Sequence, residues 1–178
     1  MSDRIPIRFD RALRPEWLDF ALEQSVRLPD TTGQRQALRE YLSSQIVGKE
    51  ALDKTITQLQ RIVGLTSPVT REQLCTFHAR MSQLSPDERT SIRLSLLMQA
   101  SPFFVDCVTA ARKLGLLSSN GFTTSQFIER IVASYGDRAV VPRATQRVLQ
   151  TLAYLGAITS KDRRWMITQV IEANRTLS

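Results

Sequence analysis

The residues from Phe122 to Gln169 constrain the fold of this chain more than any other feature. Two stretches with apolar residues at helical spacing lie on either side of a turn at Gly136-Asp137, and the second stretch ends at Gly156. A strand–turn–strand pattern follows directly. Helix, turn, helix and a short hairpin, in this order, are the outline of a winged helix.

The details of this segment come from local signals. Thr123 or Thr124 can cap the first helix. Pro142 is well placed at the start of the second helix, and Val141 is expected to be extended just before it. The hairpin is predicted as two short strands, 157–159 and 165–168, around a basic turn at 160–164.

The second helix of this segment has two contrasting faces. Its apolar face consists of five residues at helical spacing: Ala144, Val148, Leu149, Leu152 and Leu155. The opposite face presents long polar side chains that can hydrogen-bond base edges or phosphates in a major groove. These are Arg143, Gln146, Arg147, Gln150 and Tyr154, and the turn of the hairpin adds Lys161, Arg163 and Arg164.

The first two thirds of the chain show a succession of helices with clear starts and stops. A helix opens at Pro15, another is marked by residues between Leu38 and Ile46, and a third ends at Gly64. Thr70 and Ser85 each begin a capping-box pattern, and Ser101-Pro102 opens a helix expected to stop at Gly115. The sequence therefore predicts a mainly α protein, with a helical bundle over 1–117 and a winged-helix module over 118–178 packed against it.

The net charge of the chain is concentrated near its C-terminal end. The whole sequence has a formal charge of +7, and residues 138–178 hold seven basic and two acidic side chains. Most of the basic residues are arginines, whose planar guanidinium groups suit phosphate and guanine. If the protein binds a polyanion, residues 138–178 are expected to make the contact.

Catalysis, metal binding and membrane insertion are not indicated. His78 is the only histidine; Cys75 lies three residues before it, and Cys107 is the only other cysteine. Cys75 and His78 have the spacing of one half of a zinc site, and only Cys107 could add a third soft ligand, so a structural histidine is the better interpretation. We expect no enzyme activity, no cofactor and no metal. The apolar runs are too short to span a bilayer, no secretory signal is present, and two lone thiols fit the cytoplasm.

The sequence resembles the BrxA-like family of small helical proteins from bacteriophage-exclusion (BREX) loci, across roughly residues 35–158. The residues that support the resemblance are Ser101-Pro102-Phe103-Phe104-Val105-Asp106, Phe127, Tyr135-Gly136-Asp137-Arg138, Arg147-Val148-Leu149 and Leu155-Gly156, with Gly48 to Ile62 upstream. The resemblance implies a cytoplasmic, non-enzymatic, DNA-binding component of a phage-defence system. It assigns no role to an individual residue.

We therefore expect a sequence-tolerant subunit that binds double-stranded DNA. The recognition face would be Arg143, Gln146, Arg147 and Gln150, and Lys161, Arg163 and Arg164 would hold the DNA backbone. Three alternatives remain open. The basic helix face can be an ordinary solvated surface, the protein can be an adaptor that docks other proteins without contacting DNA, or it can be a dimeric transcriptional regulator.

Overall fold

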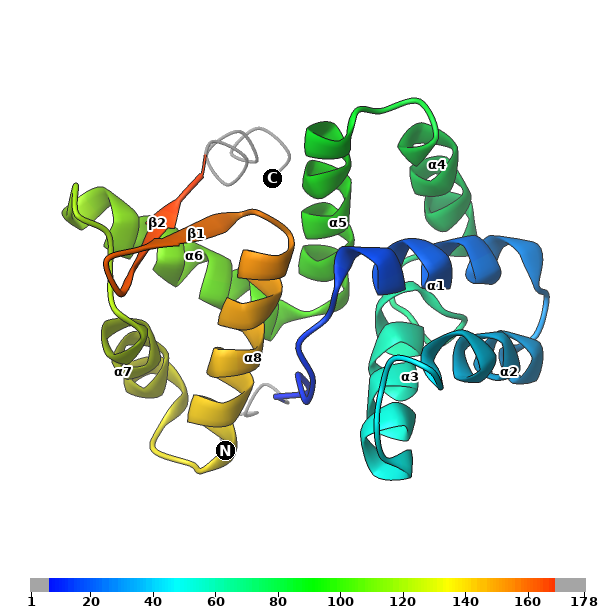
Figure 1. Ribbon diagram of the computed structural model, residues 1–178, viewed down its shortest axis with the longest axis horizontal. Helices are drawn as coiled ribbons and strands as arrows, with labels where there is room; N and C mark the ends of the chain where they lie inside the picture. Colours follow the sequence, from blue (N-terminus) through cyan, green and yellow to red (C-terminus); the bar gives the residue numbers. More distant parts are fainter. Residues whose placement is uncertain (1–6, 169–178) are drawn as a thin grey trace. The chain divides into compact units, whose positions relative to one another are not determined.

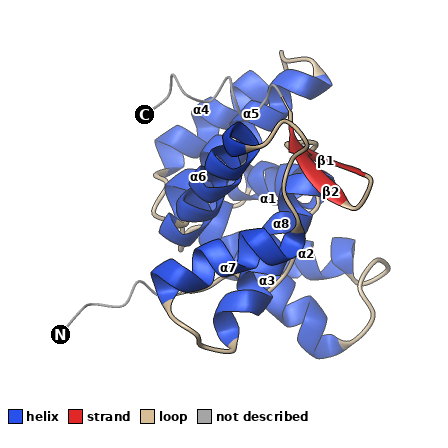
Figure 2. Cartoon of the chain, turned by 90° about the vertical axis from the view of Figure 1, so that its left-hand side faces the viewer, coloured by secondary structure: helices blue, strands red, loops and turns tan. Residues whose placement is uncertain are grey.

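The computed structural model describes residues 7–168 and shows a mainly helical protein (Figures 1 and 2). This described part contains eight helices and one small antiparallel sheet of two strands. The predicted mainly α fold class with a C-terminal hairpin is confirmed. Gln169 and the rest of the predicted module to 178 lie outside the described residues.

The chain divides into two compact units, and their boundary differs from the predicted one. One unit is Leu13–Ala100, and the described parts of the other are 7–12 and 101–168. The predicted boundary at 117 placed the helix after Ser101 in the N-terminal bundle. That helix instead packs against the helices and the strand that follow it.

Five helices form the Leu13–Ala100 unit. They are α1 (Pro15–Arg27), α2 (Thr31–Leu42), α3 (Lys49–Val63), α4 (Arg71–Met81) and α5 (Pro86–Ala100). Helix α1 contacts each of the other four, and its Leu18 and Leu22 are fully buried among them. The second helix ends at Leu42, earlier than predicted, although Ile46 beyond it is also buried.

The capping signals in the sequence produce the predicted helix starts. Thr70 and Gln73 satisfy each other's backbone amides at the start of α4, as a capping box does. At the start of α5, the Glu88 carboxylate accepts hydrogen bonds from the Ser85 amide and hydroxyl. These bonds favour the charged form and lower the pKa of Glu88.

Three helices and the hairpin form the second unit. They are α6 (Pro102–Leu117), α7 (Thr124–Tyr135), α8 (Val140–Tyr154), β1 (Ile158–Lys161) and β2 (Arg164–Ile167). Helix α6 contacts α7, α8 and β2, while α8 contacts α7 and β1. The core between them is aromatic and aliphatic: it includes Phe103, Phe104, Phe122, Phe127, Val148 and Leu152, and Phe9 stacks on Phe104.

Two element ends in this unit differ from the predictions. Helix α6 continues past Gly115 to Leu117. Gly115 provides space for β2 instead of a helix end, since a Cβ there would meet Ile167 at 2.9 Å. Val141 is not extended but helical and fully buried, and α8 begins at Val140. A proline is tolerated in the first helical turn, where its absent N–H has no intrahelical partner.

The hairpin is attached to the segment before α7 by a group of hydrogen bonds that we call the clasp, formed by Asn120–Thr124 with Arg164 and Trp165. Phe122 and Trp165 exchange both backbone hydrogen bonds, at 3.0 and 2.7 Å. The Arg164 guanidinium donates to the carbonyl oxygens of Asn120 and Gly121, at 2.8 and 2.7 Å. The Trp165 indole donates to the Thr124 hydroxyl at 3.0 Å. Phe122 thus acts as a third, one-residue strand beside β2.

The clasp requires glycine at position 121. Gly121 has a φ of 72°, and a Cβ there would overlap the Trp165 carbonyl oxygen. We expect Gly121→Ala to lower the free energy of unfolding by about 2–4 kcal/mol, because strain and overlap add. Gly156→Ala is the matched control, since Gly156 has a φ of 71° but open space around it, and should cost about 1 kcal/mol. Urea denaturation measures both; equal losses would contradict the close approach.

Candidate nucleic-acid interface

Helix α8 presents one polar face and buries the other, as its sequence predicts. All five predicted apolar residues, Ala144, Val148, Leu149, Leu152 and Leu155, are buried. Arg143 and Gln146 are exposed, whereas Arg147 and Gln150 are partly buried. Arg147 Nη1 donates a hydrogen bond to Gln150 Oε1 at 3.1 Å. The four predicted recognition residues therefore lie in one row along the helix, at positions i, i+3, i+4 and i+7.

Two threonines on the buried side of α8 are polar residues whose role the sequence did not reveal. The Thr145 hydroxyl donates to the Val141 carbonyl oxygen at 2.8 Å, and the Thr151 hydroxyl donates to that of Arg147 at 2.9 Å. Both side chains are fully buried. A buried hydroxyl costs little stability when it is bonded in this way, so the buried face remains compatible with a close-packed core.

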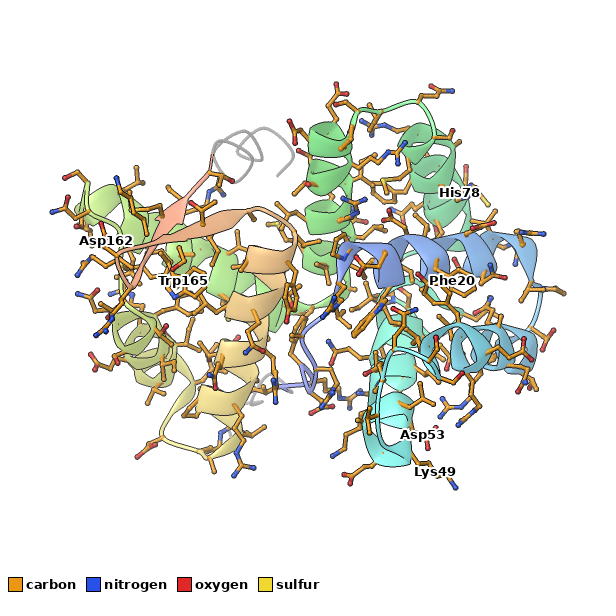
Figure 3. All side chains as sticks on the ribbon, in the orientation of Figure 1. Phe20, Lys49, Asp53, His78, Asp162 and Trp165 are labelled. Carbon is orange, nitrogen blue, oxygen red and sulfur yellow. The ribbon has the colours of Figure 1, made fainter. Side chains whose placement is uncertain are left out.

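The hairpin is tighter than predicted. Its strands pair from Ile158–Ile167 to Lys161–Arg164, which leaves only Asp162 and Arg163 in the turn instead of five residues. Their φ angles are 51° and 62°, as a type I′ turn requires. Asn-Gly or Asp-Gly normally marks such a turn, whereas here an arginine follows the aspartate. Figure 3 labels Asp162 at the turn and Trp165 on the second strand.

The three predicted basic contacts of the hairpin differ in their surroundings. Lys161 and Arg163 are exposed beside the turn. Arg164 is partly buried, and two of its nitrogen atoms donate to the main chain in the clasp. The structure thus leaves Lys161 and Arg163 open to a ligand and uses Arg164 mainly to hold the hairpin. Asn120, Gly121 and Thr124, the partners in this attachment, were not singled out from the sequence.

Positive charge in the second unit is not neutralised by neighbouring acids. Residues 101–168 contain nine basic and four acidic side chains. Within this described stretch, none of the nine basic groups forms an ion pair. Residues 13–100 are nearly balanced, with eleven basic and ten acidic side chains. Several of these are paired, as in Arg93 with Asp19 at 2.6 Å and Arg39 with Asp53 at 2.6 Å.

One acidic group of the second unit serves a structural contact. The Asp106 carboxylate on α6 accepts a hydrogen bond from the Tyr135 hydroxyl on α7 at 2.6 Å. Burial, together with this bond, raises the pKa of Tyr135 above its ordinary value. The tyrosine therefore stays neutral at physiological pH and ties the two helices together.

The residues considered for metal binding or catalysis do not form such a site in the described part of the chain. Cys75 is exposed on α4, and His78 follows one helical turn later (Figure 3 labels His78). Cys107 is buried in α6, and this burial raises the pKa of its thiol. No group of three or more histidine, cysteine or acidic side chains that could hold a metal ion is found among residues 7–168.

Comparisons with known proteins identify no relative of this chain. No protein-family model, no curated protein and no solved structure matches this chain. The resemblance to the BrxA-like family therefore stays a prediction. Within residues 7–168, no helix is both long and apolar enough to cross a membrane.

Arg163 occupies a backbone conformation that favours glycine, which gives a direct test of the turn. We expect Arg163→Gly to raise the free energy of unfolding by about 0.5–1 kcal/mol, because glycine adopts positive φ without strain. Arg163→Ala removes the same side chain but keeps the strain, so it should give no such gain. Thermal and urea denaturation of both variants measure the difference. A stability gain from alanine equal to that from glycine would show that charge, not backbone strain, is responsible.

Proposed function

We propose that this protein is a non-enzymatic, double-stranded DNA-binding component and that its second unit is a winged helix. The order α6, Phe122, α7, α8, β1, β2 supports this: it is the order of three helices and three strands in a winged helix, with the first strand reduced to one residue. In this interpretation α8 is the recognition helix, and the hairpin is the wing.

The observation that carries the proposal is the row of long polar side chains on α8, which have no acidic partner among the described residues, next to a basic hairpin. A major groove about 12 Å wide admits one α-helix, and long side chains on the exposed face then reach base edges. Arg143, Gln146, Arg147 and Gln150 would occupy the groove. Lys161 and Arg163 would contact phosphates beside it. Since these cations have no acidic partner in the described residues, a phosphate does not have to displace one.

Most of the binding free energy would come from neutralised phosphates and released counterions. Binding would therefore tolerate many sequences and weaken steeply with added salt. The resemblance to the BrxA-like family extends the proposal to a cytoplasmic role in a phage-defence system, beside other proteins of that system. No residue role depends on this extension.

An adaptor function is the second candidate, and one observation favours it. Leu116 and Leu117 at the end of α6 are 65% and 82% exposed. Neighbouring exposed leucines are suited to contact with another protein. An adaptor of this kind would bind a partner protein and show no salt-dependent affinity for DNA.

The test is the affinity for a labelled duplex across a salt series. The double variant Lys161→Gln/Arg163→Gln removes the two exposed charges that would contact phosphates, and Lys49→Gln/Arg80→Gln removes two exposed charges from the other unit. We expect the first pair to reduce the slope of log affinity against log salt by about two, since each phosphate contact contributes about 0.9. The control pair should leave that slope nearly unchanged.

Two other outcomes would contradict the proposed DNA interface. Equal effects of the two double variants would move the contact away from α8 and the hairpin. No binding by the wild-type protein at low salt would contradict DNA binding and favour the adaptor. Light scattering on the same samples measures the oligomeric state. We expect a monomer, whereas a stable dimer that binds palindromic sites would indicate a transcriptional regulator.

A further inference from the structure

We infer that α8 prefers guanine and that the hydrogen-bonded pair Arg147 and Gln150 determines this preference. The inference rests on the proposed function, because it concerns which base the same helix reads. It goes beyond that function, since contact with phosphates alone carries no base preference.

The bond between the two side chains fixes the orientation of the Gln150 amide. Arginine has only donors, so the atom of Gln150 that accepts from Arg147 Nη1 must be the amide oxygen. That oxygen is therefore directed toward Arg147. The NH₂ group keeps both of its donors for a ligand, whereas the oxygen keeps one lone pair.

This orientation disfavours adenine and suits guanine. A glutamine binds adenine through both amide atoms: its NH₂ donates to N7 and its oxygen accepts from the N6 amino group. At Gln150 the same oxygen would have to accept from N6 and from Arg147 at once, which restricts the positions that the base can take. Guanine presents two acceptors, N7 and O6, on its major-groove edge, and these match the remaining donors of Arg147 and Gln150.

The side chains of Arg147 and Gln150 also have less conformational freedom than their neighbours on the helix. Arg147 and Gln150 are partly buried, whereas Arg143 and Gln146 are exposed. Gln146 has no hydrogen-bond partner among the described residues, so it keeps both donor and acceptor. Less side-chain freedom is lost when an already bonded pair engages a base. The sequence of α8 contains no aspartate or glutamate, so no carboxylate in the row can accept from a cytosine amino group.

The experiment compares three duplexes of equal length at one salt concentration. One is rich in G·C pairs, one is rich in A·T pairs, and the third is the G·C-rich duplex with 7-deazaguanine, which lacks N7 but still pairs normally. We expect the wild-type protein to bind the first about tenfold more tightly than the second, as one bidentate base contact provides. The deaza duplex should lose most of that advantage, which separates base reading from an effect of DNA shape.

Three substitutions test whether Arg147 and Gln150 cause the preference for guanine. Arg147→Lys keeps the charge but loses the planar fork, so the salt dependence should remain while the preference falls to within about twofold of unity. Gln150→Leu should reduce the preference, and Gln146→Leu, the matched change one turn earlier, should leave it intact. Circular dichroism and denaturation confirm that each variant is folded.

The outcomes distinguish this inference from the proposed function. Salt-dependent binding that is equal on all three duplexes, or a preference that survives Arg147→Lys, would overturn the guanine assignment and leave DNA binding in place. Equal losses from Gln150→Leu and Gln146→Leu would also overturn the role of the pair. No binding to any duplex would overturn both.

Discussion

The second unit depends on the clasp that joins its hairpin to the segment before α7. A two-stranded hairpin is marginally stable by itself, so β1 and β2 need an additional attachment to keep a fixed position. The backbone pair of Phe122 with Trp165 provides it, and the Arg164 and Trp165 side chains add hydrogen bonds to the same segment. Because α8 contacts β1 and α6 contacts β2, the attachment fixes the hairpin relative to α8 and its polar face.

Charge is distributed unequally between the two units, and this has a physical consequence. In Leu13–Ala100 acids and bases are nearly equal in number and several are paired, whereas residues 101–168 have an excess of five positive charges without ion pairs. Such an excess opposes compaction through mutual repulsion. The stability of this unit must therefore come from its apolar core, where Phe103, Phe104, Phe122 and Phe127 are fully buried. A surface kept positive against this repulsion is the strongest structural argument for a polyanionic ligand.

The sequence predicted those features that depend on a few neighbouring residues. The capping box at Thr70 and the cap at Thr123 formed as expected, Glu88 accepts from the Ser85 amide as predicted, and the apolar face of α8 is the buried face. Features that depend on distant residues were missed. Nothing within Ser101–Leu117 indicates whether α6 packs against the preceding or the following helices. Only the approach of Ile167 shows that the glycine at position 115 serves close packing and not a helix end.

The hairpin shows most clearly why charge in a sequence is an incomplete guide to a binding surface. Arg163 and Arg164 are adjacent and chemically identical, and both were predicted to hold DNA. The tight turn places Arg163 at positive φ with its side chain exposed, while the next residue begins β2 and its guanidinium reaches the carbonyl oxygens of Asn120 and Gly121. Those carbonyls can be reached only because Gly121 allows the two segments to approach closely. The role of Arg164 is therefore set by a glycine 43 positions earlier, a relation that local sequence patterns do not contain.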